Sequence, residues 1–186
     1  MATLIKNAKI ATDSWQQLDW AADGSLPTVP ATGDVIVPLA LWQAMAGELL
    51  GRNGGRLGVW LDGSEDPAQI ADSLEALGLV AIHFPQFTDG RGYSTARLLR
   101  ERYGWKGELR AIGDIQRDQL YYLARCGFDA FQLNDGLDAP QGDLLRGAQG
   151  ALSAFSDFSE AYQTSVERPQ PLFRRRAEAV EVAEQS

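Results

Sequence analysis

Short apolar runs alternate with helix-forming segments through the middle of this chain, and Gly or Pro separates most of them. The runs begin near residues 57, 79, 108 and 130, as Leu57–Leu61, Leu79–Phe84, Glu108–Ile112 and Asp129–Leu133. Strands that alternate with helices of about ten residues form βα units, whose strands are parallel. A complete eight-unit barrel needs about 250 residues, and this chain has 186. The pattern therefore predicts an α/β fold with a mainly parallel sheet, either open or half-barrel-like.

The segments that flank these units set the expected domain boundaries. Residues 35–165 form the predicted α/β domain, in which Leu39–Leu50 has apolar positions close to helical spacing. Residues 1–34 form a small N-terminal addition, with a short strand over Leu4–Ile10 and then a loop rich in Gly, Pro, Ser and Thr. Residues 166–186 form a charged tail that we expect to fray.

Several chemistries are excluded by composition and by missing motifs. The chain has one cysteine, Cys126, and one histidine, His83, so no internal disulfide framework, four-thiolate cluster or multi-histidine metal site can form within it. No glycine motif for dinucleotides or phosphate loop follows a strand, and no cofactor is evident. No apolar run approaches the ~20 residues of a membrane span and no signal peptide opens the chain. We expect a cytoplasmic protein without membrane contact.

Charge is unevenly distributed along the chain. The net charge is −8 and the isoelectric point is about 4.6, which argues against nucleic-acid binding. Residues 91–125 nevertheless hold eight of the 17 basic side chains and only four acidic ones. A cationic segment in an acidic protein indicates an anionic ligand or an acidic partner, although solvated helix faces produce the same pattern.

The loop after Leu79–Phe84 is the first candidate site. Gly90 and Gly92 flank Arg91, which lets the backbone approach a ligand closely. Ser94 is the predicted N-cap of a helix over Ser94–Tyr103, whose first amides favour anions. The candidate residues for binding an anion or a partner in this loop are Thr88, Asp89, Gly90, Arg91, Gly92, Ser94 and Arg97. The alternative is a tight turn with Arg97 on a solvated helix face.

The loop after Glu108–Ile112 is the second candidate site. Asp114 is the predicted N-cap of the next helix, and Arg117 is a further binding candidate in its first turn. Carboxyl ends of parallel strands meet at one edge, so we expect both loops to share a pocket there. The candidates for proton transfer are His83, Asp89, Asp114 and Asp118. The structural alternative is a helix N-cap with acidic side chains that interact favourably with the helix dipole.

Residues His83–Leu133 also resemble a known family. The matching blocks are FTDGRGYS, ARLLR, GELRAIGD, RDQL and RCGFDAF. They are similar to those of a bacterial family catalogued as domain of unknown function family 934. Members are labelled as oxidoreductases of sulfite reduction, because their genes tend to neighbour the gene of the sulfite reductase haemoprotein.

The resemblance implies a pathway, and three roles stay open. The first is an accessory protein of sulfite reduction that docks on the haemoprotein or on its electron donor through Arg91, Arg97, Arg100 and Arg102. The second is a small α/β enzyme or sensor that binds an oxyanion or a phosphorylated metabolite at the same site. The third is a structural scaffold in which the arginines form internal ion pairs.

Overall fold

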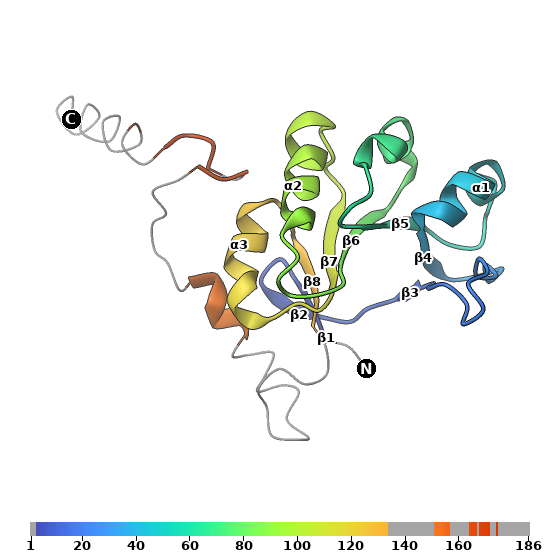
Figure 1. The fold of residues 1–186 in the computed structure, drawn as a ribbon, viewed down its shortest axis with the longest axis horizontal. Helices are drawn as coiled ribbons and strands as arrows, with labels where there is room; N and C mark the ends of the chain where they lie inside the picture. Colours follow the sequence, from blue (N-terminus) through green and yellow to red (C-terminus); the bar gives the residue numbers. More distant parts are fainter. Residues whose placement is uncertain (1–2, 134–150, 157–163, 167, 172–173, 175–186) are drawn as a thin grey trace, which may run out of the picture.

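The computed structural model contains one curled sheet with helices on its outer face (Figure 1). It describes all residues except 1–2, 134–150, 157–163, 167, 172–173 and 175–186, so most of the expected tail lies outside the described part. The strands are β1 (Thr3–Lys6), β2 (Lys9–Ala11), β3 (Trp15–Gln17), β4 (Asp34–Pro38), β5 (Leu57–Asp62), β6 (Leu79–Phe84), β7 (Glu108–Gly113) and β8 (Ala130–Leu133).

The helical segments follow the strands in turn. They are α1 (Leu39–Leu50), the 3-10 helix η1 (Pro67–Ala76), α2 (Arg91–Arg97), the π-helical turn η2 (Leu98–Arg102), η3 (Arg117–Gln119), α3 (Leu120–Arg125) and η4 (Ala154–Ser156). Asp66 caps η1 as its position before Pro67 suggests, because its carboxylate accepts from the Ala68 amide at 2.9 Å.

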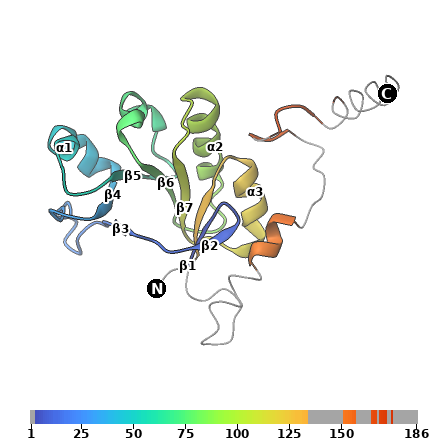
Figure 2. The same ribbon diagram turned by 180° about the vertical axis from the view of Figure 1, so that it is seen from behind.

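Strand order explains why the helices share one face. The eight strands lie in the order β2-β1-β8-β7-β6-β5-β4-β3. From β4 to β8 each strand is parallel to the one before it in the sequence. Because crossovers between parallel strands are right-handed, this unbroken order places every connecting helix on the same side. Figures 1 and 2 show these helices side by side along one side of the sheet. The predicted mainly parallel, half-barrel-like α/β fold is confirmed.

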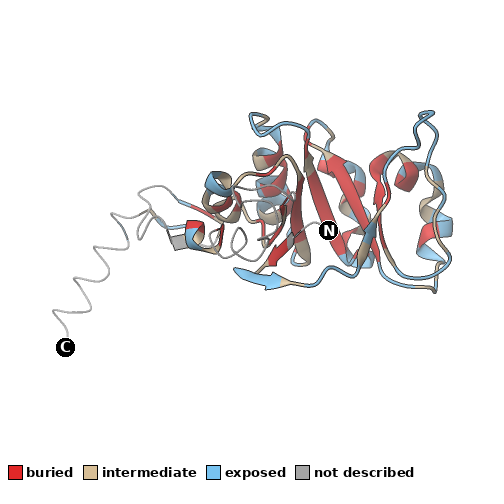
Figure 3. Cartoon of the chain, turned by 90° about the horizontal axis from the view of Figure 1, so that it is seen from below, coloured by how far each residue is buried: buried red, intermediate tan, exposed pale blue. Residues whose placement is uncertain are grey.

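The parallel strands β4 to β7 bury consecutive residues, and so side chains on both faces (Figure 3). Val80 and Ile82 of β6 belong to the large cluster beneath the helices, whereas Leu79 and Ala81 face the inner, concave side. Trp60 and Ile112 lie on that inner side as well. Two-sided burial explains why the parallel strands read as continuous apolar runs in the sequence.

The N-terminal residues complete the sheet at both of its edges. The hairpin β1–β2 is antiparallel and pairs with β8, whereas β3 pairs with β4 at the opposite edge. Three residues, 12–14, connect β2 to β3, and they span at most about 15 Å. Seven flat strand spacings would need about 34 Å. The sheet therefore curls, and this strap (residues 12–14) runs across its open side (Figure 1).

A buried ionic network fastens the strap to the inner face. The Arg110 side chain is only 1% exposed; its Nη1 donates to Asp13 of the strap at 2.7 Å. Its Nε and Nη2 lie 2.9 and 2.7 Å from Oε1 of Glu108, and Lys6 of β1 reaches Oε2 of the same carboxylate at 2.6 Å. One arginine thus joins the strap to β7, and Glu108 joins β7 to β1.

Three local predictions from the sequence are wrong. The helix expected from Ser94 begins at Arg91 after Gly90, and Ser94 is not its cap. Asp114 does not cap the following helix, because Gln116 does so in a capping box with Gln119. The single strand expected over Leu4–Ile10 is a hairpin that turns at Asn7 and Ala8, both with positive φ.

Candidate functional site

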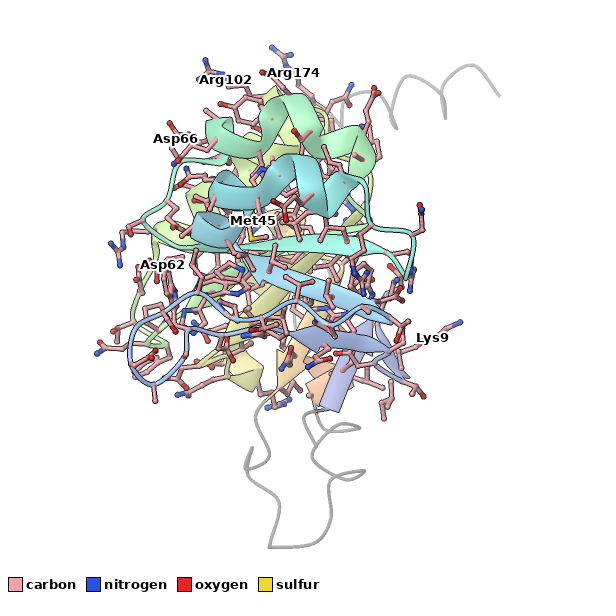
Figure 4. The ribbon with its side chains drawn as sticks, turned by 90° about the vertical axis from the view of Figure 1, so that its right-hand side faces the viewer. Lys9, Met45, Asp62, Asp66, Arg102 and Arg174 are labelled. Carbon is pink, nitrogen blue, oxygen red and sulfur yellow. The ribbon has the colours of Figure 1, made fainter. Side chains whose placement is uncertain are left out.

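The carboxyl-terminal ends of β5, β6 and β7 form the rim of the half-barrel. Figure 4 shows Asp62, the last residue of β5, on the side of the molecule opposite Lys9. The loops after β6 and β7 meet at this rim, because the Asp114 carboxylate accepts from the Phe87 amide at 3.0 Å. The side-chain amide of Gln119 donates to the Phe87 carbonyl at 2.8 Å. The structure thus brings the two candidate loops together.

Two glycines permit this close approach. Gly113 has a φ of +97°, and a Cβ there would lie 2.3 Å from the Phe84 carbonyl oxygen. A Cβ on Gly92 would lie 2.6 Å from the Phe84 ring, so α2 packs against β6 only without a side chain at that position. Both positions require glycine for steric reasons, independently of any ligand.

Phe87 is the most exposed large apolar side chain of the rim loops. The residue is 51% exposed, although hydrogen bonds hold its backbone on both sides. Phe87 stands at the start of the FTDGRGYS motif, and no role was predicted for it. A Phe between two polar residues in a Gly-containing loop is the signal that could have identified it.

Arg91 and Asp89 form a close pair in the same loop as Phe87. Nε and Nη2 of Arg91 lie 2.9 and 2.6 Å from the two carboxylate oxygens of Asp89. These hydrogen bonds lower the pKa of Asp89 to about 2. The Arg91 amide also donates to Asp89 at 3.1 Å and so begins α2. The guanidinium is therefore fixed in direction while remaining exposed to solvent.

The other predicted binding residues are spread over the surface. Thr88, Gly90 and Ser94 are exposed near Arg91. Arg97 pairs with Glu101 on the outer face of the helix at 2.8 Å. Arg117 donates to Ser153 at 2.9 Å, and Asp118 is exposed beside it. Arg97 and Arg117 thus contact partners other than the Arg91 and Asp89 pair.

Arg100 and Arg102 lie away from the rim. Nη1 of Arg100 donates to the carbonyls of Trp105 and Gly107, which precede β7 at the opposite end of the strands. Its Nη2 pairs with Asp129 at 3.0 Å, and the Arg102 guanidinium lies over the Tyr103 ring. Arg100, like Arg110, serves the fold through internal contacts. The four arginines suggested for docking therefore do not form one surface.

His83 lies on the inner face of the rim and has an acidic neighbour that sequence reasoning missed. His83 of β6 is in register with Asp62 of β5, and Nδ1 lies 3.8 Å from Oδ2 of Asp62. The Trp60 ring meets the imidazole edge-on, with centroids 5.7 Å apart. The signal that could have suggested this pair is the position of both residues near the carboxyl ends of adjacent parallel strands.

Glu65 extends this group. Its carboxylate accepts from the Asp62 amide at 2.7 Å, and burial together with the Asp62 charge raises the pKa of Glu65. The Asp62 side chain also accepts from the Ser64 hydroxyl at 3.0 Å. Among the described residues, no group of three or more His, Cys, Asp and Glu side chains could hold a metal ion.

A cavity of about 280 Å³ lies at the other end of the strands, beside the turn between β1 and β2. It is lined by Asn7, Ala8, Tyr121, Ala124, Arg125, Phe128, Asp129, Phe131 and Phe155. Burial raises the pKa of Asp129, whose carboxylate already accepts from Arg100 and from the Leu109 amide. None of the site residues predicted from the sequence lines this cavity.

Fold and rim together define a class of protein: a curled half-barrel of βα units with polar loops gathered at the carboxyl-terminal edge of its sheet. Residues 58–173 match the family described as "Bacterial protein of unknown function (DUF934)". This match covers more than half of the chain. The chain therefore belongs to that family. The matched region contains every rim residue named above and excludes the strap. No curated protein matches the chain. In the described residues, no helix is both long and apolar enough to cross a membrane.

Proposed function

We propose that this chain is an accessory protein of sulfite reduction that docks on the sulfite reductase haemoprotein through its rim. The link to sulfite reduction rests on the family resemblance of residues His83–Leu133. The docking surface, defined as Phe87, Thr88 and Arg91, rests on the geometry of the rim. In this proposal the haemoprotein carries the electron-transfer chemistry, and this chain needs no cofactor of its own.

The observation that carries the proposal is the rigid presentation of Phe87. Its amide and carbonyl are both bonded to the neighbouring loop, while the residue is half exposed. A flexible loop loses conformational entropy when it becomes ordered in a complex, and this loss weakens binding. The loop that holds Phe87 is already ordered by folding, so binding does not carry this cost. Burying a full Phe side chain contributes about 1.5–3 kcal/mol. An exposed ring on a fixed backbone is thus suited to insertion into a pocket of a partner.

Arg91 adds an oriented, positively charged group to this surface. Asp89 holds one side of the guanidinium, so little side-chain entropy remains to be lost on binding. Aromatic residues and Arg are enriched at protein interfaces and among their energetically dominant residues. The partner should therefore present an apolar pocket for Phe87 and an acidic or carbonyl group for Arg91.

A free oxyanion fits the same rim less well. Arg91 is already paired with Asp89; hydrogen bonds to Asp89 raise the pKa of Arg91, and the charge of Asp62 adds to this. A small dianion would meet these carboxylates before it met an unshared guanidinium. We therefore expect sulfite, sulfate and phosphate to leave the melting temperature unchanged, whereas a bound anion would raise it by linkage.

Affinity capture tests the docking proposal. The tagged chain, purified from sulfate-grown cells, should retain the haemoprotein, and Phe87→Ala and Arg91→Ala should each weaken the purified complex about tenfold or more. Leu98→Ala and Arg102→Ala are matched controls, because both side chains are exposed but lie outside the docking surface. Equal retention by all four variants would refute the proposed surface. Capture of the electron donor alone would refute the haemoprotein as the partner.

A further inference from the structure

His83 and Asp62 form a pair with the ingredients of proton transfer. The imidazole and the carboxylate come from adjacent strands in register, 3.8 Å apart between Nδ1 and Oδ2. Catalytic hydrogen bonds are often this long without a ligand and shorten when one binds. The side chains are 32% and 35% exposed, so a small molecule can reach both of them.

The surroundings restrict the imidazole. Trp60 meets the ring edge-on, and the indole nitrogen is itself bonded to the Leu18 carbonyl at 2.9 Å. On the other strand, the missing Cβ of Gly113 leaves room for the ring, since a Cβ there would lie 2.9 Å from Cδ2 of His83. The imidazole is thus bounded by a fixed indole on β5 and by backbone on β7.

We propose that His83 and Asp62 are a general acid–base dyad that acts on an uncharged small molecule at the mouth of the half-barrel. Asp62 orients the ring through Nδ1–H, which leaves the Nε2 lone pair to take a proton from the substrate. The Asp62 carboxylate stabilises the imidazolium that forms, and Nε2 returns the proton to the product or to water. No oxidant, reductant or metal takes part in this step.

The neighbouring charges select the substrate class. Asp89 is paired with Arg91 at 2.6 Å, and Asp62, at the end of β5, lies next to Glu65, whose carboxylate accepts from the Asp62 amide. A multiply charged anion would be repelled by these carboxylates, whereas an uncharged molecule with an acidic C–H, O–H or S–H group would not. This inference is independent of docking, because neither Phe87 nor the haemoprotein enters the dyad.

The uncharged chromogenic reagent 5-nitrobenzisoxazole tests the base directly. A base removes the C3 proton, the N–O bond breaks, and a nitrile and a coloured phenolate form. The reaction therefore needs no oxidant, reductant or further reactant. The purified chain should accelerate this elimination at least about tenfold over His83→Gln, since positioned bases contribute about 10²–10⁴-fold. Asp62→Asn should lower the rate by a similar factor. Asp72→Asn removes the same charge from the exposed surface of η1 and should leave the rate unchanged.

Spectroscopy separates proton transfer from a structural role. His83 is the only histidine, so one set of imidazole ¹⁵N signals reports its tautomer without ambiguity. We expect the Nδ1–H tautomer in the native chain and a shift away from it in Asp62→Asn, with the rest of the amide spectrum unchanged. The elimination rate should fall as the His83 signals report protonation. A rate equal to that of His83→Gln, or an Asp62→Asn variant with native rate and tautomer, would overturn the dyad.

Discussion

Replacing Arg110 by Met should release the N-terminal strap and destabilise the whole half-barrel. The guanidinium is 1% exposed and joins Asp13 of the strap to Glu108 of β7. Met keeps most of the apolar stem and removes three charged hydrogen bonds. The substitution therefore isolates the ionic contribution from that of packing.

The expected magnitude follows from the two carboxylates that remain. Breaking a buried ion pair costs about 3–5 kcal/mol, because an uncompensated charge stays behind. Glu108, 7% exposed, retains Lys6 at 2.6 Å, and Asp13, 25% exposed, can regain water. The cost should thus be at the lower end, about 3 kcal/mol. For a chain of this length that corresponds to a melting temperature lower by about 6–12 °C.

Urea denaturation and hydrogen exchange measure the two parts of this prediction. The midpoint should fall with an unchanged slope, and amides next to the strap should lose protection. The double variant Glu108→Leu, Arg110→Met removes both buried charges and should be more stable than Arg110→Met alone. If Arg110→Met lies within about 1 kcal/mol of the native chain, or if the double variant is the less stable one, the network does not fasten the strap as argued.

Two further predictions concern the rim. Gly113→Ala should cost about 1–3 kcal/mol or more in urea denaturation, because its φ is +97° and its Cβ would contact the Phe84 oxygen. Gly24→Ala also has positive φ but open space, so an equal cost would refute the steric argument. The pKa of Asp89 is lowered to about 2, so its pairing with Arg91 stabilises the fold above about pH 4 and is lost as the pH falls towards 2. A carboxyl NMR titration of Arg91→Ala should return Asp89 to an ordinary pKa; an unchanged value would assign the shift to another cause.

The elements of the fold could be predicted where local chemistry decides them. Leu79–Phe84 and Leu39–Leu50 occur with the predicted bounds, because one is a continuous β-forming run and the other begins after Pro38 and ends before Gly51. The start of α2 could not be predicted from Ser94, since Asp89 accepts from the Arg91 amide and turns the chain into the helix earlier. That start also requires Gly92 against the Phe84 ring, a contact between separate elements.

The candidate site could be predicted only in outline. Parallel strands place their carboxyl ends at one edge, and the two predicted loops do meet there through Asp114 and Phe87. The pairing of His83 with Asp62 depends on strand register, which neighbouring residues in the sequence do not specify. The ion pairs of Arg100 and Arg110 likewise depend on partners that are distant in the sequence, Asp129 and Asp13.

The sequence by itself determined the type and order of the elements, because burial on both faces and breaks at Gly and Pro are local properties. The short link between β2 and β3 decided the curl of the sheet, but only once β2 and β3 had paired at opposite edges. The tertiary structure alone decided which charged side chains form internal ion pairs and which remain exposed at the rim. The physical reason is that ion pairs and strand register depend on contacts between residues far apart in the sequence. These contacts exist only in the complete fold, so no isolated segment specifies them.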